Sequence, residues 1–251
     1  MVTPAPADGR AEIGGLRPAA VVERTTELAG DELRRSVSPA LVTVVAQLRS
    51  QNATGVGTGI VLSSDGEVLT NYHVIAGGSA LRVTDVGNGE TYSASVVGVD
   101  RQHDVAVLRL RGASGLRVAK LGNSATVRPG TQVAAIGDAD GPGEQLSVVT
   151  GSVTGLGRAV QTRRDELTGK TERLSGLIEV AADVREGFSG GPVVDGAGRV
   201  LGVTVAATVE AGGDDPGGSG FAIPISTALA AAHRISSAHP QSRPGALAGR
   251  R

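Results

Sequence analysis

The sequence contains no cysteine and no tryptophan, and aromatic residues account for only 2% of its 251 residues. The absence of cysteine excludes disulfides, thiolate metal sites and a cysteine nucleophile. Because aromatic side chains are so few, the core has to be built mainly from Val, Leu, Ile and Ala. The chain is long enough to bury such a core. Its 40% hydrophobic and 20% charged residues are typical of a globular protein rather than a disordered one.

The charges nearly cancel, with 24 basic and 25 acidic residues and a formal net charge of −1. This balance argues against a nucleic-acid-binding protein that relies on bulk positive charge. No apolar run approaches the roughly 20 residues that a membrane helix requires, and the first residues lack the charged-then-apolar order of a signal peptide. We therefore expect no nucleic-acid partner and no membrane span in this chain.

Glycine is abundant, with 38 residues spread between short Val-rich runs. This pattern predicts many short strands joined by tight turns. Six strands are predicted in the first half, at residues 40–48, 54–62, 68–71, 81–86, 92–99 and 105–110. Six more are predicted in the second half, at 131–136, 146–156, 177–181, 192–194, 200–206 and 221–223. Two sets of six strands indicate an all-β protein with two small barrels or sandwiches.

The segments between and beyond these strands complete the organisation. The charged stretch 158–173 has almost no apolar residue and predicts an exposed loop, and 211–220 predicts a second loop. Apolar residues at helical spacing predict one late helix over 225–235.

A single folded domain is predicted over residues 36–236, with its two halves at about 36–115 and 125–225. Residues 1–35 are predicted to be an N-terminal extension or linker that is partly helical near its end. Residues 237–251 are predicted to be a disordered tail.

Three short segments carry residue types that suit nucleophilic catalysis. The strand-like run 69–75 leads into His73, Asp104 opens an apolar strand, and Ser189 lies in the glycine-rich turn 187–191. A serine hydroxyl is a poor nucleophile near neutral pH and needs a base within hydrogen-bonding reach. Histidine suits that task, and a buried aspartate fixes its tautomer and stabilises the imidazolium. The glycines let backbone N–H groups converge on a developing oxyanion, and the order His, Asp, Ser is one known to build this triad.

Each of these residues also has an ordinary explanation. A histidine at a strand end is usually a surface or core residue, an aspartate before a strand is usually a turn residue, and Ser-Gly-Gly is common in loops. His103 adjoins Asp104 and competes with His73 for the same role. The combination, in this order and with each residue at a predicted strand end, favours the catalytic interpretation.

Six collinear motifs give the chain a family resemblance. They are Gly57-Thr58-Gly59-Ile60-Val61-Leu62, Thr70-Asn71-Tyr72-His73-Val74-Ile75, Asp104-Val105-Ala106-Val107-Leu108, Val133-Ala134-Ala135-Ile136-Gly137, Ser189-Gly190-Gly191-Pro192 and Gly220-Phe221-Ala222-Ile223-Pro224. Over roughly residues 38–235 the chain resembles the protease domain of the HtrA/Deg serine proteases, which have the chymotrypsin fold. The resemblance implies two perpendicular six-stranded β-barrels with the active site in the cleft between them.

The same resemblance implies the roles of individual residues. His73 would be the general base, Asp104 its orienting partner and Ser189 the nucleophile. The backbone N–H groups of Gly187 and Ser189 would form the oxyanion hole. The expected activity is that of a serine endopeptidase.

Two departures from the family pattern support a rival from another functional class. Phe188 precedes the serine where most relatives have Asn or Asp, and the chain ends soon after the second barrel, without the PDZ module common in the family. The rival is a catalytically weak or inactive trypsin-fold module that binds or senses a partner. The complete triad favours the enzyme.

The substrate pocket is predicted from the segments that line it in this fold, here Asp183, Thr204, Val205, Ala206, Gly220 and Phe221. Asp183 lies six positions before Ser189, the spacing at which trypsins place the aspartate that binds Arg or Lys. If its carboxylate faces solvent instead, and Arg185 pairs with it, the small apolar pocket usual in HtrA-like proteases is expected. We favour the apolar pocket.

The histidines do not cluster, and no phosphate-binding Gly-Lys-Ser/Thr motif is present, so no metal and no cofactor are expected. The resemblance implies protein or peptide substrates and is compatible with a homo-oligomer. It also implies an extracytoplasmic bacterial location, in the cell envelope or outside the cell, with any membrane anchor lying outside this chain.

Overall fold

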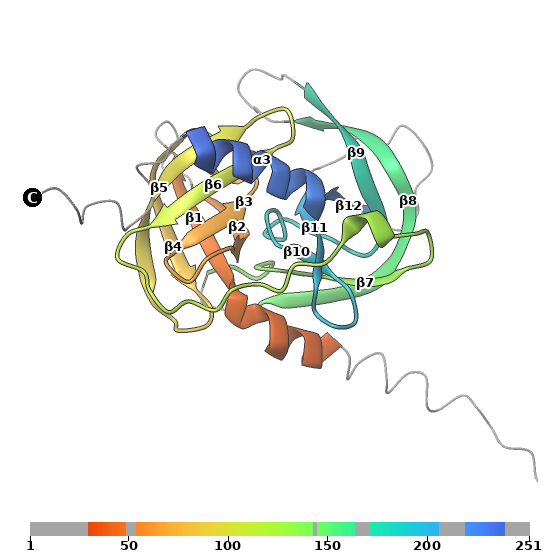
Figure 1. The fold of residues 1–251 in the computed structure, drawn as a ribbon, viewed down its shortest axis with the longest axis horizontal. Helices are drawn as coiled ribbons and strands as arrows, with labels where there is room; N and C mark the ends of the chain where they lie inside the picture. The colour runs from red at the N-terminus through yellow and green to blue at the C-terminus, as the bar shows by residue number, and fades with distance from the viewer. Residues whose placement is uncertain (1–29, 49–53, 143–144, 164–170, 206–218, 239–251) are drawn as a thin grey trace, which may run out of the picture.

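The computed structural model describes residues 30–48, 54–142, 145–163, 171–205 and 219–238. Twelve strands within these ranges form two closed six-stranded antiparallel barrels, followed by a C-terminal helix (Figure 1). The predicted fold class is therefore confirmed. Each predicted strand overlaps an observed one, and 105–110 and 192–194 have the predicted bounds.

The first barrel pairs its strands in the order β1-β2-β3-β6-β5-β4. Its strands are β1 (Leu41–Leu48), β2 (Thr54–Val61), β3 (Glu67–Thr70), β4 (Gly78–Asp85), β5 (Thr91–Asp100) and β6 (Val105–Leu110). A short helix, α2 (Tyr72–Ile75), follows β3 directly. The second barrel pairs its strands in the order β10-β11-β12-β9-β8-β7. Its strands are β7 (Gln132–Gly137), β8 (Ser147–Arg163), β9 (Thr171–Ala181), β10 (Pro192–Val194), β11 (Val200–Val205) and β12 (Ser219–Pro224).

The prediction of an exposed loop over 158–173 is wrong at both of its ends, because β8 continues to Arg163 and β9 begins at Thr171. The middle of this segment, 164–170, lies outside the described residues. The two strands pair as a ribbon in which most of the side chains with described exposure, such as those of Arg158, Gln161 and Arg173, are exposed, in keeping with the few apolar residues of the segment. The exception is the directly paired Val160 and Leu174, which are both buried. Since strand prediction depends on apolar alternation, such a ribbon resembles a loop in sequence.

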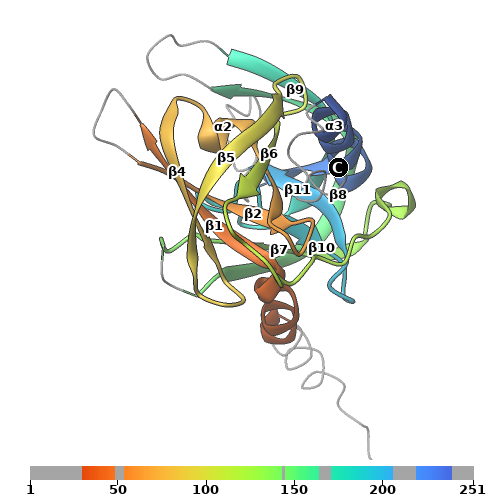
Figure 2. The same cartoon turned by 60° about the vertical axis from the view of Figure 1, so that its left-hand side comes forward.

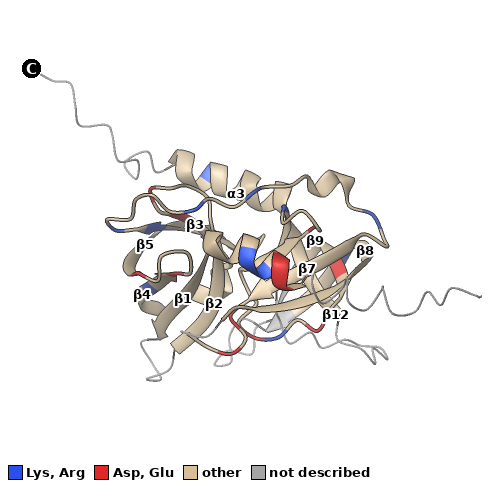
Figure 3. Cartoon of the chain, turned by 90° about the horizontal axis from the view of Figure 1, so that it is seen from below, with Lys and Arg blue, Asp and Glu red and all other residues tan. Residues whose placement is uncertain are grey.

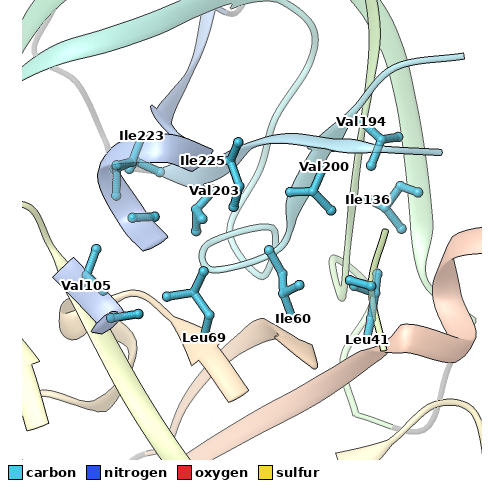
Figure 4. Close-up of a cluster of buried hydrophobic side chains, with 14 of the residues drawn as sticks. Leu41, Ile60, Leu69, Val105, Ile136, Val194, Val200, Val203, Ile223 and Ile225 are labelled. Carbon is cyan, nitrogen blue, oxygen red and sulfur yellow. The ribbon is translucent and has the colours of Figure 1, made fainter. Parts of the chain in front are cut away.

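The core explains why several strands are apolar on both faces. In β6, Val105 and Val107 join a cluster shared by the two barrels, whereas Ala106 and Leu108 point into the first barrel. Successive side chains of a strand point to opposite faces, so a strand between two cores is apolar throughout. The shared cluster contains side chains from both barrels and from the C-terminal helix. Figure 4 shows among them Leu41, Ile60, Leu69, Val105, Ile136, Val194, Val200, Val203, Ile223 and Ile225.

Two helices pack against the outside of the barrels. Residues 30–37 form a helix that buries Leu33 and Val37 in the shared core, so the predicted boundary at residue 36 falls inside it (Figure 2). The second helix, α3 (Ile225–Ala238), leaves β12 and returns to the first barrel, where Arg234 pairs with Asp100 at 3.0 Å. It ends three residues beyond the predicted end at residue 235. Most of the predicted tail lies outside the described residues.

None of the helices in these ranges is long and apolar enough to cross a membrane. The helix over residues 30–37 carries acidic and basic side chains side by side, and the other described charges are scattered over α3, the strands and the loops (Figure 3).

Candidate active site

The fold brings together His73, Asp104 and Ser189, which are far apart in sequence. The Nε2 atom of His73 lies 2.9 Å from Ser189 Oγ, and its Nδ1 atom lies 2.7 Å from Asp104 Oδ2. His73 and Asp104 come from the first barrel, and Ser189 comes from the second. This geometry allows a neutral imidazole to accept the serine proton while the carboxylate stabilises the resulting imidazolium.

The corner between β3 and α2 fixes His73 against Asp104. The backbone N–H of His73 donates to Asp104 Oδ1 at 3.0 Å. Two further donors hold the Asp104 carbonyl, namely Asn71 Nδ2 at 3.0 Å and the Tyr72 N–H at 3.2 Å. The Arg101 guanidinium lies over the Tyr72 ring, 5.1 Å from its centroid. The histidine and the aspartate are thus joined by both backbone and side-chain contacts.

Asp104 has an unusual backbone conformation, with φ of +55°, the single positive φ of a non-glycine residue in the described part of the chain. Aspartate tolerates this left-handed region better than most residues, at some cost in strain. Its side chain is buried, with 1% exposed. The turn before it is held by Asp100, whose Oδ2 atom lies 2.9 Å from His103 Nδ1. His103 is therefore engaged by Asp100, and His73 is the histidine that contacts Asp104.

Ser189 lies in a turn that enters β10, and two glycines give the turn its shape. Gly187 and Gly190 have φ of +88° and +83°. A Cβ atom on Gly187 would lie 1.8 Å from the Asp138 carbonyl oxygen, and one on Gly190 would lie 2.1 Å from the Thr58 carbonyl oxygen. Both positions therefore require glycine, for conformation and for space.

Backbone bonds tie the same turn to its surroundings. The Gly190 N–H donates to the Thr204 carbonyl at 3.0 Å, and the Thr204 N–H donates to the Gly191 carbonyl at 2.8 Å. From the first barrel, the Thr58 N–H donates to the Ser189 carbonyl at 2.8 Å. Ser189 is buried, with 4% of its surface exposed, so its hydroxyl is held among fixed neighbours.

Phe188, the departure noted in the sequence, packs inward. Its side chain is fully buried in the hydrophobic core of the second barrel. Gly137 lies directly against it, because a Cβ atom there would come within 2.5 Å of Phe188 Cα. The aromatic ring therefore fills the barrel rather than lying over Ser189.

The residues predicted to line a substrate pocket occupy different environments. The Asp183 side chain is 66% exposed and pairs with Arg185 at 2.6 Å. Thr204 and Val205 of β11 are buried and pair with Ala222 and Phe221 of β12, next to Gly220. Ala206 lies outside the described residues.

Sequence reasoning missed two neighbours of the site. Val184 lies over Gly220, where a Cβ atom would meet Val184 Cγ2 at 2.6 Å. Thr58 bonds to the serine turn from the opposite barrel. Val184 gives no sequence signal, because its contact depends on tertiary packing. Thr58 lies inside the Gly57-Thr58-Gly59 motif, and its position in this motif is the sequence feature that could have marked it as a neighbour of the site.

Within the ranges that the structure describes, no group of three or more His, Asp or Glu side chains is arranged to hold a metal ion. The chemistry available to the three central residues, His73, Asp104 and Ser189, is proton transfer and nucleophilic attack.

Comparison with known proteins gives consistent matches. A trypsin-like peptidase domain matches residues 57–203. HhoB of Synechocystis is 37% identical over 181 residues, which are 72% of this chain and 40% of HhoB. Protease Do-like 1 of the Arabidopsis thaliana chloroplast is 35% identical over 214 residues, which are 81% of this chain and 46% of that protein. The chain thus spans less than half the length of these curated relatives.

A solved structure agrees with the sequence matches. The HtrA-type protease AlgW with a tripeptide superimposes with a TM-score of 0.67 at 31% identity, over 81% of this chain and 62% of AlgW. A peptidase-domain match over more than half of the chain, together with the two-barrel fold, shows that the chain belongs to the trypsin-like peptidase family, with HtrA-type proteases as its relatives.

Proposed function

We propose that this chain is a serine endopeptidase that hydrolyses peptide bonds through an acyl-enzyme. The observation that carries the proposal is the continuous contact from Asp104 through His73 to Ser189, at 2.7 and 2.9 Å. The family match and the protease names of the relatives support it. An inactive binding module is not favoured, because the three side chains are in contact and the Phe188 side chain packs into the core of the second barrel.

The mechanism follows from the roles we assign to the residues. Ser189 Oγ attacks the peptide carbonyl carbon while His73 Nε2 accepts the hydroxyl proton, and Asp104 stabilises the imidazolium. The N–H groups of Gly187 and Ser189 donate to the oxyanion of the tetrahedral intermediate. His73 then returns the proton to the amine, and the C–N bond breaks to leave an ester on Ser189. Water repeats the sequence with His73 as base, releasing the acid and regenerating the hydroxyl.

Labelling by a fluorophosphonate probe tests the assignment. The wild-type chain should label, and Ser189→Ala should not, while both give the same circular dichroism spectrum. Ser124→Ala is the matched control, because its hydroxyl bonds Ser226 at 2.8 Å on the surface, and it should label like the wild type. A folded wild-type chain that does not label at Ser189 would contradict the proposal.

We further propose that the pocket beside Ser189 accepts a small apolar side chain. The Asp183 carboxylate is exposed and engaged by Arg185, so it is poorly placed to bind a cationic substrate residue. The Val184 side chain lies against Gly220 and fills space that a pocket for a large side chain would require. A cleavage profile on a peptide library should therefore show residues such as Val or Ala, not Arg or Lys, before the scissile bond.

An extracytoplasmic bacterial location is also proposed. The name of a Pseudomonas savastanoi relative, 33% identical over 195 residues, describes a periplasmic serine endoprotease, whereas the Arabidopsis relative is chloroplastic. Fractionation of the source cells tests this proposal, and recovery in the cytosol alone would contradict it.

A further inference from the structure

Thr58 belongs to β2 of the first barrel, yet its polar atoms bind the serine turn of the second. Its hydroxyl donates to the Gly187 carbonyl at 2.7 Å, and its backbone N–H donates to the Ser189 carbonyl at 2.8 Å. The hydroxyl also accepts from the Asp138 N–H at 3.0 Å. Thr58 has no exposed surface, so these bonds are shielded from competing water.

The bonds reach the peptide units on which an oxyanion hole at this turn depends. The Gly187 carbonyl belongs to the peptide between Gly187 and Phe188, which lies between the N–H groups of Gly187 and Ser189. Because glycine restricts its own dihedral angles so little, the turn needs outside contacts to fix how its peptides face. Thr58 supplies such contacts on both sides of Phe188.

A second pair of side chains braces Thr58. Thr43 of β1 donates its hydroxyl to Asp138 Oδ2 at 2.7 Å, and both side chains are buried. Asp138 follows β7 directly, so this bond also crosses from the first barrel to the second. The Asp138 N–H then donates to Thr58, which places Thr43, Asp138, Thr58 and Gly187 in one hydrogen-bonded chain.

We propose that Thr58 is a positioning residue, whose hydroxyl holds the Gly187–Phe188 peptide so that the N–H groups of Gly187 and Ser189 face the oxyanion. The inference rests on the proposed peptidase function. Through Thr58, the first barrel would help to stabilise the transition state, in addition to supplying His73 and Asp104. Thr58 acts through the turn and does not itself contact substrate.

Thr58→Val tests the proposal, because valine keeps the shape of threonine but neither donates nor accepts. It leaves the Gly187 carbonyl and the Asp138 N–H without this partner, so the Gly187–Phe188 peptide loses a contact that fixes its orientation, whereas the backbone bonds of the turn remain. We expect kcat to fall by roughly 10- to 100-fold, less than the loss of a whole oxyanion donor, while KM stays within about threefold. Thr58→Ser restores a hydroxyl and should recover most of kcat.

Two measurements separate positioning from general damage. Active-site titration corrects kcat for the fraction of competent molecules. A peptidyl boronic acid, which forms a tetrahedral adduct with the serine, should lose affinity by about the same factor as kcat/KM. The control Thr126→Val loses a comparable hydroxyl-to-carbonyl bond, from Thr126 to Asn123 at 2.8 Å on the surface, and should change neither value.

The outcomes are distinguishable from failure of the proposed function. If wild-type Ser189 does not react with the fluorophosphonate, the peptidase assignment fails. If the wild type is active and folded Thr58→Val keeps its kcat and its boronic acid affinity, the role of Thr58 is overturned. If Thr58→Val does not fold, Thr43→Val tests the proposal instead. It removes the hydrogen bond to Asp138, which belongs to the same hydrogen-bonded series but lies farther from Ser189. A severalfold fall in kcat supports the proposal, and an unchanged kcat overturns it.

Discussion

Asp104 holds His73 at two points with its two carboxylate oxygens. Oδ1 accepts the backbone N–H of His73 at 3.0 Å, and Oδ2 lies 2.7 Å from ring atom Nδ1. One oxygen therefore fixes the backbone of α2, and the other fixes the imidazole. The proton on Nδ1 faces the carboxylate, which leaves the lone pair of Nε2 toward Ser189 Oγ.

Asp104→Asn should separate these two tasks. The asparagine Oδ1 still accepts the His73 N–H, but its Nδ2 donates toward Nδ1 and selects the tautomer with the proton on Nε2. That tautomer cannot accept the serine proton. We expect kcat to fall by about 10³- to 10⁴-fold with little change in KM, as measured on a peptide substrate. A fall below tenfold in a folded variant would contradict the assigned role.

Gly190→Ala should disrupt the serine turn. The added methyl would lie 2.1 Å from the Thr58 carbonyl oxygen and 2.2 Å from Thr70 Oγ1, at a φ of +83°. Since backbone has to move, we expect a loss of about 2 kcal/mol or more in unfolding free energy and loss of fluorophosphonate labelling. Gly196→Ala is the control, because nothing lies within 4 Å of its Cβ position. Retention of normal labelling by Gly190→Ala would show that the turn is more pliable than its contacts indicate.

Asp100→Asn should destabilise the chain in a pH-dependent way. Burial alone would raise the pKa of Asp100, but hydrogen bonds from His103 and Arg234 outweigh it and lower the pKa. A lowered pKa contributes stability above the ordinary value near 3.9, and this is lost as pH falls through the folded value. At pH 7 the variant should lose about 1 kcal/mol, a modest figure because Arg234 is largely exposed. Urea unfolding at pH 7 and pH 3 should show the difference shrinking, and a constant difference would refute this account.

Asp85 should show the opposite pH dependence. Burial raises its pKa, and the backbone N–H groups of Asn88 and Gly87 offset this only in part. The folded chain therefore binds this proton more tightly than the unfolded chain. Protonation of Asp85 raises the unfolding free energy of the protein as pH falls toward 4. The Asp85→Asn variant lacks the carboxylate and cannot gain this stabilisation. The unfolding free energy of the variant relative to the wild type should therefore fall between pH 7 and pH 4, and a rise would contradict the sign.

Two neighbouring substitutions should have different effects on specificity. Asp183→Ala removes an exposed, paired carboxylate and should leave the peptide-library profile unchanged. Val184→Ala removes side-chain bulk beside Gly220 and should shift preference toward larger apolar residues by about tenfold. If the wild type prefers Arg or Lys and Asp183→Ala loses this preference, the carboxylate binds the substrate side chain and the prediction is wrong.

The sequence by itself determined the strand pattern and the three central residues. Val-rich runs separated by glycine turns predicted twelve strands, and β6 and β10 have the expected ends. His73, Asp104 and Ser189 were predicted because each lies near the end of a predicted strand and inside a distinctive motif. These signals are local, so they can be recognised before the chain is folded.

Tertiary structure decided the features that depend on contacts between residues far apart in the sequence, within one barrel or between the two. The ribbon of β8 and β9 is held by strand pairing, although its exposed faces carry few apolar residues. The exposure of Asp183 and its pairing with Arg185 were an alternative that the sequence already offered. By contrast, Val184 in the loop after β9 lies over Gly220 because β9 and β12, which are distant in sequence, pair side by side. Thr58 reaches Gly187 across 129 positions. A local pattern does not encode such contacts, because their energy depends on distances between residues that become close only after the chain has folded.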